Sequence, residues 1–437
     1  MSRRGTARRS LGSTGSTTPD AYHVEHIKIN SWDLGEEKDI TDSVKKIKVT
    51  EDLNQPYVEV HLVILDAIGL INELKMNGSE IVKLKIKRNP EKKSSQDNAK
   101  LELTLKAIEI FGYSRLTPTR QGYTIRCCSE HLYKNQTKLL QRPFENTIGK
   151  LVEDIVRKDL GVDQDRINVL NTSTKGIIKG IYPSLRPYYA IKWLLRNAYE
   201  DSTPFYFYET ARGGIYFQSY KSLVQQEPYD TYDYRSFFEA DKGTPEYYDE
   251  VRRRITRLSS PLNMSQFNNI GQGVYGSTLH TFDIAEKKKE KYFYSYGKMK
   301  TLNENKPYPA NDQISDQAYE DLKQSKNYYI SLNTKAFEGQ NNYHEPLKPT
   351  ILKGEAHYQS MNFNDMKVDI PGDFFLEAGF VMDLNVIRAS SAAQLEESNM
   401  IDKFFSGKYL IQRIEHVFDG QYRQNITLRR DSLGVTL

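Results

Sequence analysis

Apolar and polar residues alternate along much of the first third of the chain. This alternation has the period of two that is typical of strands with one buried face. It is clearest at Val58, Val60, Leu62 and Ile64, at Val82, Leu84 and Ile86, and at Leu101, Leu103, Leu105 and Ala107. A further strand is indicated from Tyr123 to Cys127. We therefore predict a barrel-like antiparallel β domain over residues 22–132, with residues 89–100 as a solvated hairpin tip.

The apolar period becomes helical after residue 140. Apolar residues then recur three and four positions apart, at Ile148, Leu151, Val152, Ile155 and Val156. This spacing places them on one face of a helix. Asn146 or Thr147 is suited to cap its start, and Gly161 is placed to end it.

A second helix and a hairpin follow in the same region. The helix is predicted from Pro187 to Tyr199, because proline fits the first helical turn. Two aromatic runs, residues 205–209 and 215–220, flank a turn that contains two glycines, which is a hairpin signal. We therefore place an α+β domain at residues 133–235.

Strands dominate the prediction again in the last part of the chain. We predict strands from Pro245 to about Met299, a short helix after Pro309 and another helix from Leu352 to Phe363. Further apolar runs are residues 366–370, 380–386, 409–418 and 426–428. They predict a second barrel-like β domain over residues 236–437, with a polar, partly helical insertion around residues 300–360. The polar segment from Ile387 to Lys403 is a candidate contact loop.

The composition is that of a polar globular protein, and its charge names no partner. A chain of 437 residues suggests about three domains. Lys and Arg number 61 against 57 Asp and Glu, and the resulting +4 is too small to indicate a nucleic-acid-binding surface. Residues 1–21 are a separate case, because they carry four arginines in a stretch rich in Ser, Thr and Gly. We expect a disordered basic arm there, or one that becomes ordered against a neighbouring subunit.

The two cysteines, Cys127 and Cys128, are adjacent on a predicted strand. Their side chains would point to opposite faces and would not form a disulfide with each other, which favours a reducing compartment. No stretch approaches the ~20 apolar residues of a membrane span, and the N-terminus lacks the apolar core of a secretory signal. We therefore expect a protein that is made in the cytoplasm and does not insert stably into a membrane.

Signatures of catalysis and of cofactor binding are missing from the sequence. There is no phosphate-binding loop, no nucleophile elbow and no zinc-protease motif, so we predict no catalytic, cofactor-binding or metal site. His23 and His26 have a spacing that resembles a metal pair, but a pair of surface histidines explains it equally well. The acidic residues show no local pattern of paired carboxylates for glycoside hydrolysis.

A cluster of lysines and aromatic residues mixes the two residue types of single-strand nucleic-acid binders. It consists of Lys287, Lys288, Lys289 and Lys291, followed by Tyr292, Phe293, Tyr294 and Tyr296. We favour the alternative interpretation, a polar turn that leads into an aromatic strand.

Several segments resemble phage baseplate hub proteins in their order and spacing. The segment with the clearest resemblance extends from Phe405 to Phe418 and continues through Gly420, Tyr422 and residues 427–431. Residues 368–384 and 269–283 are similar to two further hub segments, and residues 189–196, 205–209 and 214–223 resemble a helix and hairpin that hubs share with type VI secretion spikes. The resemblance covers most of residues 25–435.

The resemblance implies the fold, the assembly and the partners. The fold would be α+β and mainly β, with two barrel-like antiparallel β domains, an inserted α+β domain and a few short helices. The chain would be a structural subunit of a homotrimeric ring in a contractile phage tail, joining the sixfold tail tube to the threefold central spike. Its partners would be a separate spike protein, tail tube or tube-initiator proteins, and also baseplate wedge and tape-measure proteins, with no specific nucleic acid.

Two other functions stay open, a tail-associated cell-wall-degrading enzyme and a nucleic-acid-binding portal or injected protein. His416 would be the obvious general base of an enzyme, but we expect it to be hydrogen-bonded and structural. Gly407 is expected to allow a tight start to the strand that follows it. Leu410, Ile414 and Phe418 are expected to share one face of that strand.

Overall fold

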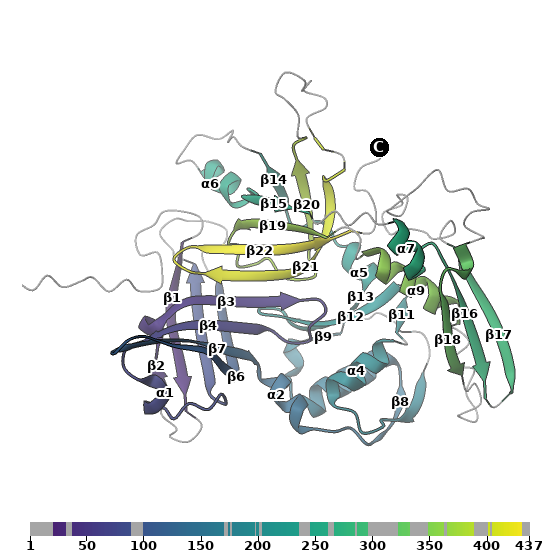
Figure 1. Ribbon diagram of the computed structural model, residues 1–437, viewed down its shortest axis with the longest axis horizontal. Helices are drawn as coiled ribbons and strands as arrows, with labels where there is room; N and C mark the ends of the chain where they lie inside the picture. Colours follow the sequence, from purple (N-terminus) through teal and green to yellow (C-terminus); the bar gives the residue numbers. More distant parts are fainter. Residues whose placement is uncertain are drawn as a thin grey trace, which may run out of the picture.

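The structure is a computed structural model in which strands predominate, which confirms the predicted α+β, mainly β class. It describes residues 21–31, 37–88, 99–169, 174, 177–196, 198–200, 203–235, 245–260, 266–284, 286–295, 322–332, 348–361, 365–388, 401–402 and 404–430. The predicted basic arm, the hairpin tip, the helix after Pro309 and most of the contact loop lie outside these residues. Figure 1 shows a long sheet, a helix-containing middle part beside it, and a small sheet at the far end.

One sheet of thirteen strands contains segments from both ends of the chain. Its N-terminal strands are β1 (Tyr22–Asn30), β2 (Glu37–Asp39), β3 (Val44–Asp52), β4 (Glu59–Asp66), β5 (Ile81–Arg88), β6 (Lys100–Thr117) and β7 (Arg120–Ser129). Its later strands are β14 (Thr231–Tyr234), β15 (Arg257–Ser259), β19 (Met366–Pro371), β20 (Val381–Val386), β21 (Gly407–Phe418) and β22 (Tyr422–Arg429). The strand order is β15-β19-β22-β21-β3-β4-β7-β6-β5-β1-β2, and β20 pairs with both β14 and β21.

The antiparallel pair of β3 and β21 joins the two β parts of the chain. Phe418 lies opposite Ile47 at one end of this pair, and Arg413 lies opposite Asp52 at the other. The two β parts that the sequence predicts as separate barrels are therefore connected edge to edge in one sheet (Figure 1). The domain boundaries themselves stay a prediction.

The alternation in the N-terminal part places one apolar face of each strand in a common core. Val60, Leu62 and Ile64 of β4 are buried there with Val82, Leu84 and Ile86 of β5. The predicted strands at residues 58–64, 82–86, 101–107 and 123–127 are confirmed as β4, β5, β6 and β7. Short helical segments accompany them: a 3-10 turn (Thr41–Ser43), α1 (Leu70–Glu73) and α2 (Glu130–Thr137).

The middle part packs helices against a small sheet. Its strands are β8 (Pro143–Asn146), β9 (Ile167–Val169), β10 (Ile178–Ile181), β11 (Tyr199–Glu200), β12 (Thr203–Thr210) and β13 (Gly214–Ser219). Its helical segments are α3 (Ile148–Asp154), a π-helical turn (Ile155–Asp159), a 3-10 turn (Gln164–Arg166), α4 (Pro187–Leu195) and α5 (Tyr220–Val224). Both predicted helices and the predicted hairpin are confirmed, and Gly161 has the left-handed φ of +64° expected just beyond a helix.

Two helix ends differ in detail from the prediction. The second helix ends at Leu195 instead of Tyr199, because Tyr199 begins β11 and pairs with Pro204 of β12. Thr147 precedes α3, but its side chain accepts no capping hydrogen bond; the N–H of Gly149 in the first turn donates a 3.4 Å hydrogen bond to Oγ1 of Thr174 instead.

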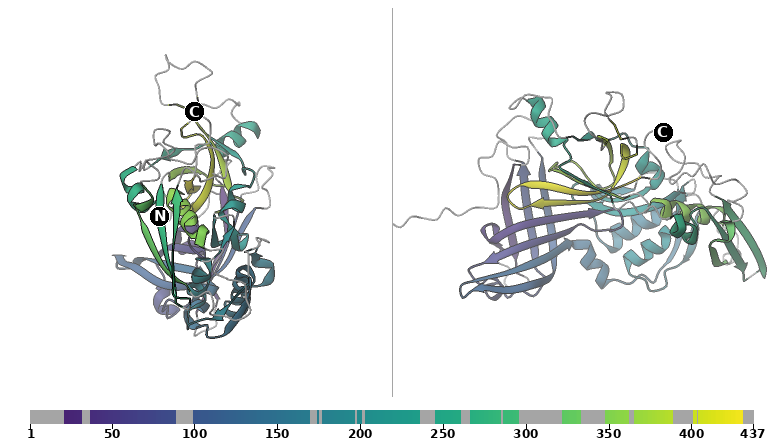
Figure 2. Two further views of the ribbon diagram at one scale, coloured as in Figure 1. Left: turned by 90° about the vertical axis from the view of Figure 1, so that its right-hand side faces the viewer. Right: turned by 45° about the horizontal axis from the view of Figure 1, so that its top comes forward.

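The remaining elements form the small sheet and its surroundings. They are α6 (Pro245–Arg252), α7 (Gln266–Gln272), β16 (Gly276–Asp283), β17 (Lys288–Ser295), a 3-10 turn (Leu322–Gln324), β18 (Asn327–Leu332) and α9 (Lys348–Met361). The helix predicted at residues 352–363 is confirmed as α9, in which Leu352 and Ala356 are buried against the sheet. The right view in Figure 2 shows this sheet at the margin of the molecule. Among the described helices, none is long and apolar enough to span a membrane.

Two predictions in this region are confirmed only in part. Strands are expected from Pro245 to about Met299, and β15, β16 and β17 confirm strands there, but α6 and α7 are helices. In α6, the proline begins the helix and Asp249 lies 3.9 Å from Arg252 one turn later, which are features of a helix and not of a strand. The polar turn that leads into an aromatic strand is the second: β17 is that strand and a turn at residues 286–287 precedes it, but β17 begins at Lys288 and so contains three of the four lysines.

A bulge in β21 overturns the expected common face of three residues. The pairing register of β21 with β22 shifts between Ile411 and Arg413. The extra residue brings Ile411 and Ile414 into one core and turns Leu410 toward another, while Phe418 is buried in the N-terminal core. Gly407, by contrast, has φ of +115° where β21 begins, as expected for a tight start.

Candidate functional site

Three buried glutamates from separate parts of the chain lie where the long sheet meets the middle part. Glu51 belongs to β3, Glu209 to β12, and Glu377 to the connection between β19 and β20. Their exposed fractions are 1%, 2% and 6%. A buried carboxylate is costly in free energy unless hydrogen bonds and charges compensate for its lost hydration. The partners of each glutamate therefore show how the parts are held together.

Glu51 binds the backbone at two turns. Its Oε1 accepts a hydrogen bond of 2.8 Å from the N–H of Ala211, and its Oε2 accepts one of 3.0 Å from the N–H of Ala378. Ala211 follows β12, and Ala378 precedes β20. One side chain of β3 therefore fixes the middle part and the C-terminal β part at the same time.

Glu209 connects the middle part to the N-terminal β part. It accepts a 2.9 Å hydrogen bond from the N–H of Val58 and another from the hydroxyl of Ser129, and the Nε2 of His131 lies 3.0 Å from it. Burial opposes ionisation of Glu209, but the charge and hydrogen bond of His131, with the bond from Ser129, hold its pKa below the usual value. Glu209 is thus a buried anion with donors from β7, α2 and the β3–β4 connection.

Glu377 lies beside Glu51, and its carboxyl ionises at a higher pH than that of an ordinary glutamate. The hydroxyl of Thr210 donates a hydrogen bond of 2.8 Å to its Oε2. Burial and, second, the negative charge of Glu51 raise the pKa of Glu377 to about 7. This side chain therefore changes its protonation state near neutral pH.

A fourth buried acid, Asp373, organises the C-terminal β part. Its Oδ2 accepts hydrogen bonds of 3.0 Å from Arg252 and 3.1 Å from the hydroxyl of Tyr229. His416 lies close by, with its Nδ1 2.8 Å from the hydroxyl of Tyr422, which donates to the backbone carbonyl of Asp373. His416 is thus hydrogen-bonded and buried, as the sequence predicts. Among the described residues its polar contacts are with Tyr422, Gln424 and Glu51, none of which is a serine, threonine or cysteine.

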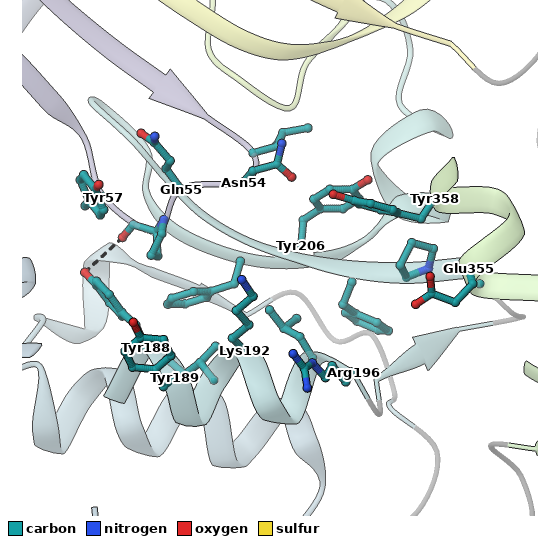
Figure 3. A pocket seen from close by; sticks show the side chains of 18 of the residues that line it. Asn54, Gln55, Tyr57, Tyr188, Tyr189, Lys192, Arg196, Tyr206, Glu355 and Tyr358 are labelled. Atoms are coloured by element: carbon teal, nitrogen blue, oxygen red, sulfur yellow. Dashed lines mark hydrogen bonds between the residues drawn. The ribbon is translucent and has the colours of Figure 1, made fainter. Parts of the chain in front are cut away.

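A groove of about 760 Å³ opens beside this junction. It is bounded by the β3–β4 connection, α4, β12 and α9. Figure 3 shows Lys192 and Arg196 on the α4 side, Glu355 and Tyr358 on α9, and Tyr206 on β12 between them. Segments from four regions of the sequence therefore meet in one concave surface.

The chemistry of the groove is that of a binding surface. Burial raises the pKa values of Tyr188 and Tyr206, so that both phenols stay protonated and are poor nucleophiles at neutral pH. The Tyr188 hydroxyl donates a 3.4 Å hydrogen bond to the carbonyl of Pro56 and contacts Nδ1 of His131 (Figure 3 shows the former). Aromatic walls with positive charge on one side and Glu355 on the other suit an extended polypeptide segment.

Most of the residues that the sequence singles out as candidates do not lie together in the structure. Cys127 and Cys128 are both free and buried, as expected for adjacent residues of one strand, and burial raises the pKa of the Cys128 thiol to about 12. His23 and His26 lie on β1 across a bulge. Among the described residues, no group of three or more His, Cys, Asp or Glu side chains is arranged to hold a metal ion.

The junction glutamates were missed by sequence reasoning. Acidic residues next to strands are normally solvated, and nothing local marks Glu51 or Glu377 as buried. A faint signal exists for Glu209, because it ends the aromatic run Phe205–Tyr208, all of whose members are buried or half-buried in β12.

Comparison with known proteins relates the whole fold to tail proteins. No protein-family model and no curated protein matches the chain. A tail protein from Neisseria meningitidis MC58 is similar in structure, with a TM-score of 0.52 and 9% sequence identity, over 94% of this chain and 98% of that one. The 43 kDa tail protein of prophage MuSo2 from Shewanella oneidensis matches with a TM-score of 0.51 and 9% identity, over 93% of this chain and 98% of that one. The chain therefore has the fold of these tail proteins.

Proposed function

We propose that this chain is a structural baseplate hub subunit. In this proposal three copies form a ring that connects the sixfold tail tube to the threefold central spike of a contractile phage tail. The observation that carries the proposal is the structural match to tail proteins over nearly the full length of both chains. The chain is then a component of the virion tail, made in the host cytoplasm, and it acts by holding a shape.

The seam between β3 and β21 supports such a role. A ring subunit that bridges two symmetries needs two β parts in a fixed relation, so that three copies present six. Here the two parts share one sheet, and Glu51 of β3 fixes the C-terminal β part through the N–H of Ala378, while Glu209 fixes the middle part to the N-terminal β part. Buried polar networks of this kind are rigid, because each group has lost its hydration and depends on its partner.

Exposed apolar side chains offer surfaces for neighbouring subunits. The hairpin of β6 and β7 extends beyond the core, and Phe111, Tyr113 and Leu116 near its tip are 40%, 58% and 59% exposed. We call residues 111–120 the β6–β7 arm; every one of them is exposed. Clusters of exposed apolar residues mark interaction sites more often than single ones do. We assign the arm to the contact between subunits of the ring.

The remaining partners follow from the position of a hub. A separate spike protein would bind one side of the ring and tail tube or tube-initiator proteins the other, while wedge and tape-measure proteins would contact its periphery and lumen. The groove between α4 and α9 is one surface that a partner segment would fit.

Native mass spectrometry of the purified protein tests the proposal. We expect a mass of three chains and, in electron micrographs, a ring with threefold symmetry. A stable monomer at micromolar concentration in the presence of the spike, or a ring of six copies, would contradict it. The same preparation tests the enzymatic alternative: clearing of a peptidoglycan suspension would favour a cell-wall-degrading enzyme, and we expect none.

A further inference from the structure

The small sheet at the margin of the molecule has two faces of different character. Its strands are neighbours in the order β17-β16-β18. The inner face packs against Leu352 and Ala356 of α9 through Leu279, Tyr292, Tyr294, Tyr328 and Ile330. Figure 1 shows α9 on the side of the long sheet, so that the other face of the small sheet lies on the side away from α9. We call that other face the outer face.

The strand pairing arranges the outer face in three rows. The rows are Phe293, Thr278 and Asn327, then Lys291, His280 and Tyr329, then Lys289, Phe282 and Ser331. Successive rows are two residues apart along each strand, or roughly 6.7 Å. Each row holds one aromatic residue of the set Phe293, Tyr329 and Phe282, and the three lie on three different strands, β17, β18 and β16 respectively.

The three aromatic rings of the outer face are largely exposed to solvent. Tyr329 is 75% exposed, Phe293 is 59% exposed and Phe282 is 49% exposed. Phe, Tyr and Trp normally contribute large buried areas to cores and interfaces. Three exposed rings on one side of one small sheet therefore indicate an interaction surface, whereas a single exposed ring would not.

The charge of the outer face has one sign. Lys289 and Lys291 are exposed on it, one beside Phe282 and the other beside His280. The acidic residues of the same strands, Asp283 and Glu290, fall at alternate positions and so point to the inner side. None of the nine outer positions is Asp or Glu. The outer face therefore combines lysines with aromatic rings and has no acidic side chain at these nine positions.

One of the rings is held in a defined orientation. The rings of His280 and Tyr329 are stacked, with centroids 4.7 Å apart and planes inclined by 9°. The Nε2 of His280 lies 3.2 Å from Oδ1 of Asn327, within hydrogen-bond distance. Because the ring of Tyr329 already has a fixed plane, stacking of a flat ligand on it would cost little conformational entropy.

We propose that the outer face binds single-stranded nucleic acid without sequence preference. Bases would stack on Tyr329, Phe293 and Phe282, and Lys289 and Lys291 would contact phosphates. Stacking on aromatic side chains with positive charge along the backbone is how sequence-tolerant single-strand binding works, because every base has a π face. This activity goes beyond a structural role in a ring and does not depend on it.

The geometry favours nucleic acid over an acidic protein segment. A protein partner of a flat sheet face would be expected to bury the aromatic residues in a continuous apolar core. Here each of the three rings shares its row with polar or charged side chains, so the rings form no continuous apolar core and each would contact a separate planar group. The sequence alone could not settle this, because only the strand register shows that Lys289, Lys291 and Phe293 share one face.

Fluorescence anisotropy with a labelled oligothymidylate of about 12 nucleotides tests the proposal. We expect saturable binding of the full-length protein that weakens with salt. With about two phosphate contacts, the affinity should fall roughly sevenfold between about 50 and 200 mM salt. Phe293→Ala and Tyr329→Ala should each weaken binding at least about fivefold. Lys289→Gln with Lys291→Gln should remove most of the salt dependence.

Matched variants elsewhere on the surface serve as controls. Tyr133→Ala removes an aromatic ring of α2 that is 42% exposed, and Lys83→Gln removes an exposed lysine of β5. Neither should change binding of the oligonucleotide. The three outer-face variants should keep the melting temperature and the mass of the wild-type assembly, because the substituted side chains are exposed. A variant that loses binding and folds normally separates this proposal from the hub function.

Three results would overturn the proposal. The first is no binding of the oligonucleotide at low salt. The second is equal loss of affinity in the control variants. The third is binding of heparin, a polyanion without bases, with the same affinity and no effect of Phe293→Ala or Tyr329→Ala, which would indicate a site for polyanions or acidic proteins that uses charge alone.

Discussion

Glu377 is a residue whose ionisation opposes folding. Its pKa rises from 4.5 to about 7 through burial and then through the charge of Glu51. Between these two pH values the folded protein binds more protons than the unfolded chain, so stability falls as the pH rises. The stabilisation is fully present below pH 4.5 and is lost above about 7.

Replacing this carboxyl by an amide should therefore flatten the pH dependence of stability. In urea unfolding, the wild type should lose on the order of 3 kcal/mol more than Glu377→Gln between pH 4.5 and 7. The amide keeps an oxygen for the hydroxyl of Thr210, so the variant should still fold.

A glutamate with the opposite shift provides the control. Burial opposes ionisation of Glu415, but the hydrogen bond from Lys48 and the charges of Lys48 and Arg413 lower its pKa. Glu415→Gln should lose stability at neutral pH and match the wild type at low pH, where the carboxylate is protonated in both states. If Glu377→Gln has the wild-type profile, another group is responsible for the pH dependence.

At the scale of elements, the start of β21 depends on a backbone conformation. Gly407 has φ of +115° and lies opposite Leu384 of β20. A β-branched residue is strained there, so Gly407→Val should lower the free energy of unfolding by about 1–3 kcal/mol. Gly271→Ala in α7 is the matched control, because no atom lies within 4 Å of the added methyl group and alanine favours a helix. Chemical denaturation measures both, and equal stability of the two variants would contradict the prediction.

Elements with a regular apolar period could be predicted from the sequence, and others could not. β4, β5 and β22 have a buried face and a solvated one, and α3 and α4 have a helical stripe, so periodicity finds them. α2 has no such stripe, because its buried residues are His131 and Asn135. In a sequence, a helix that is held by polar contacts cannot be told from a surface loop.

The long-range strand pairing and the burial of the junction glutamates also could not be predicted from the sequence. Nothing local in β3 or β21 indicates that they pair, and a single bulged residue changes which side chains of β21 face each core. The buried state of Glu51 depends on two backbone N–H groups, at Ala211 and Ala378, that only the complete fold brings to it.

At the scale of the whole molecule, the β6–β7 arm should decide assembly without affecting the fold of a single chain. Tyr113→Asp with Leu116→Asp places charges on side chains that are already 58% and 59% exposed, so the melting temperature should stay close to wild type. If the arm lies in a subunit contact, the affinity should fall at least about 30-fold. Light scattering over a concentration series measures the trimer fraction.

The control for the arm lies on the middle part. Ile181 in β10 is 68% exposed, and Ile181→Asp should leave the trimer fraction unchanged. A trimer that tolerates both arm substitutions would move the subunit contact to another surface.

The seam between β3 and β21 also has a consequence for biosynthesis. Lys48 and Glu415 across this seam are 367 residues apart in the chain. At 5–20 residues per second, a ribosome needs about 20–70 s to bridge that distance. During this interval β3 exposes one of its edges, and an uncovered edge is prone to pair with other chains. Chaperones that hold nascent chains should therefore contact this protein between the emergence of the two strands, and a release of the chain before residue 407 would leave an aggregation-prone fragment.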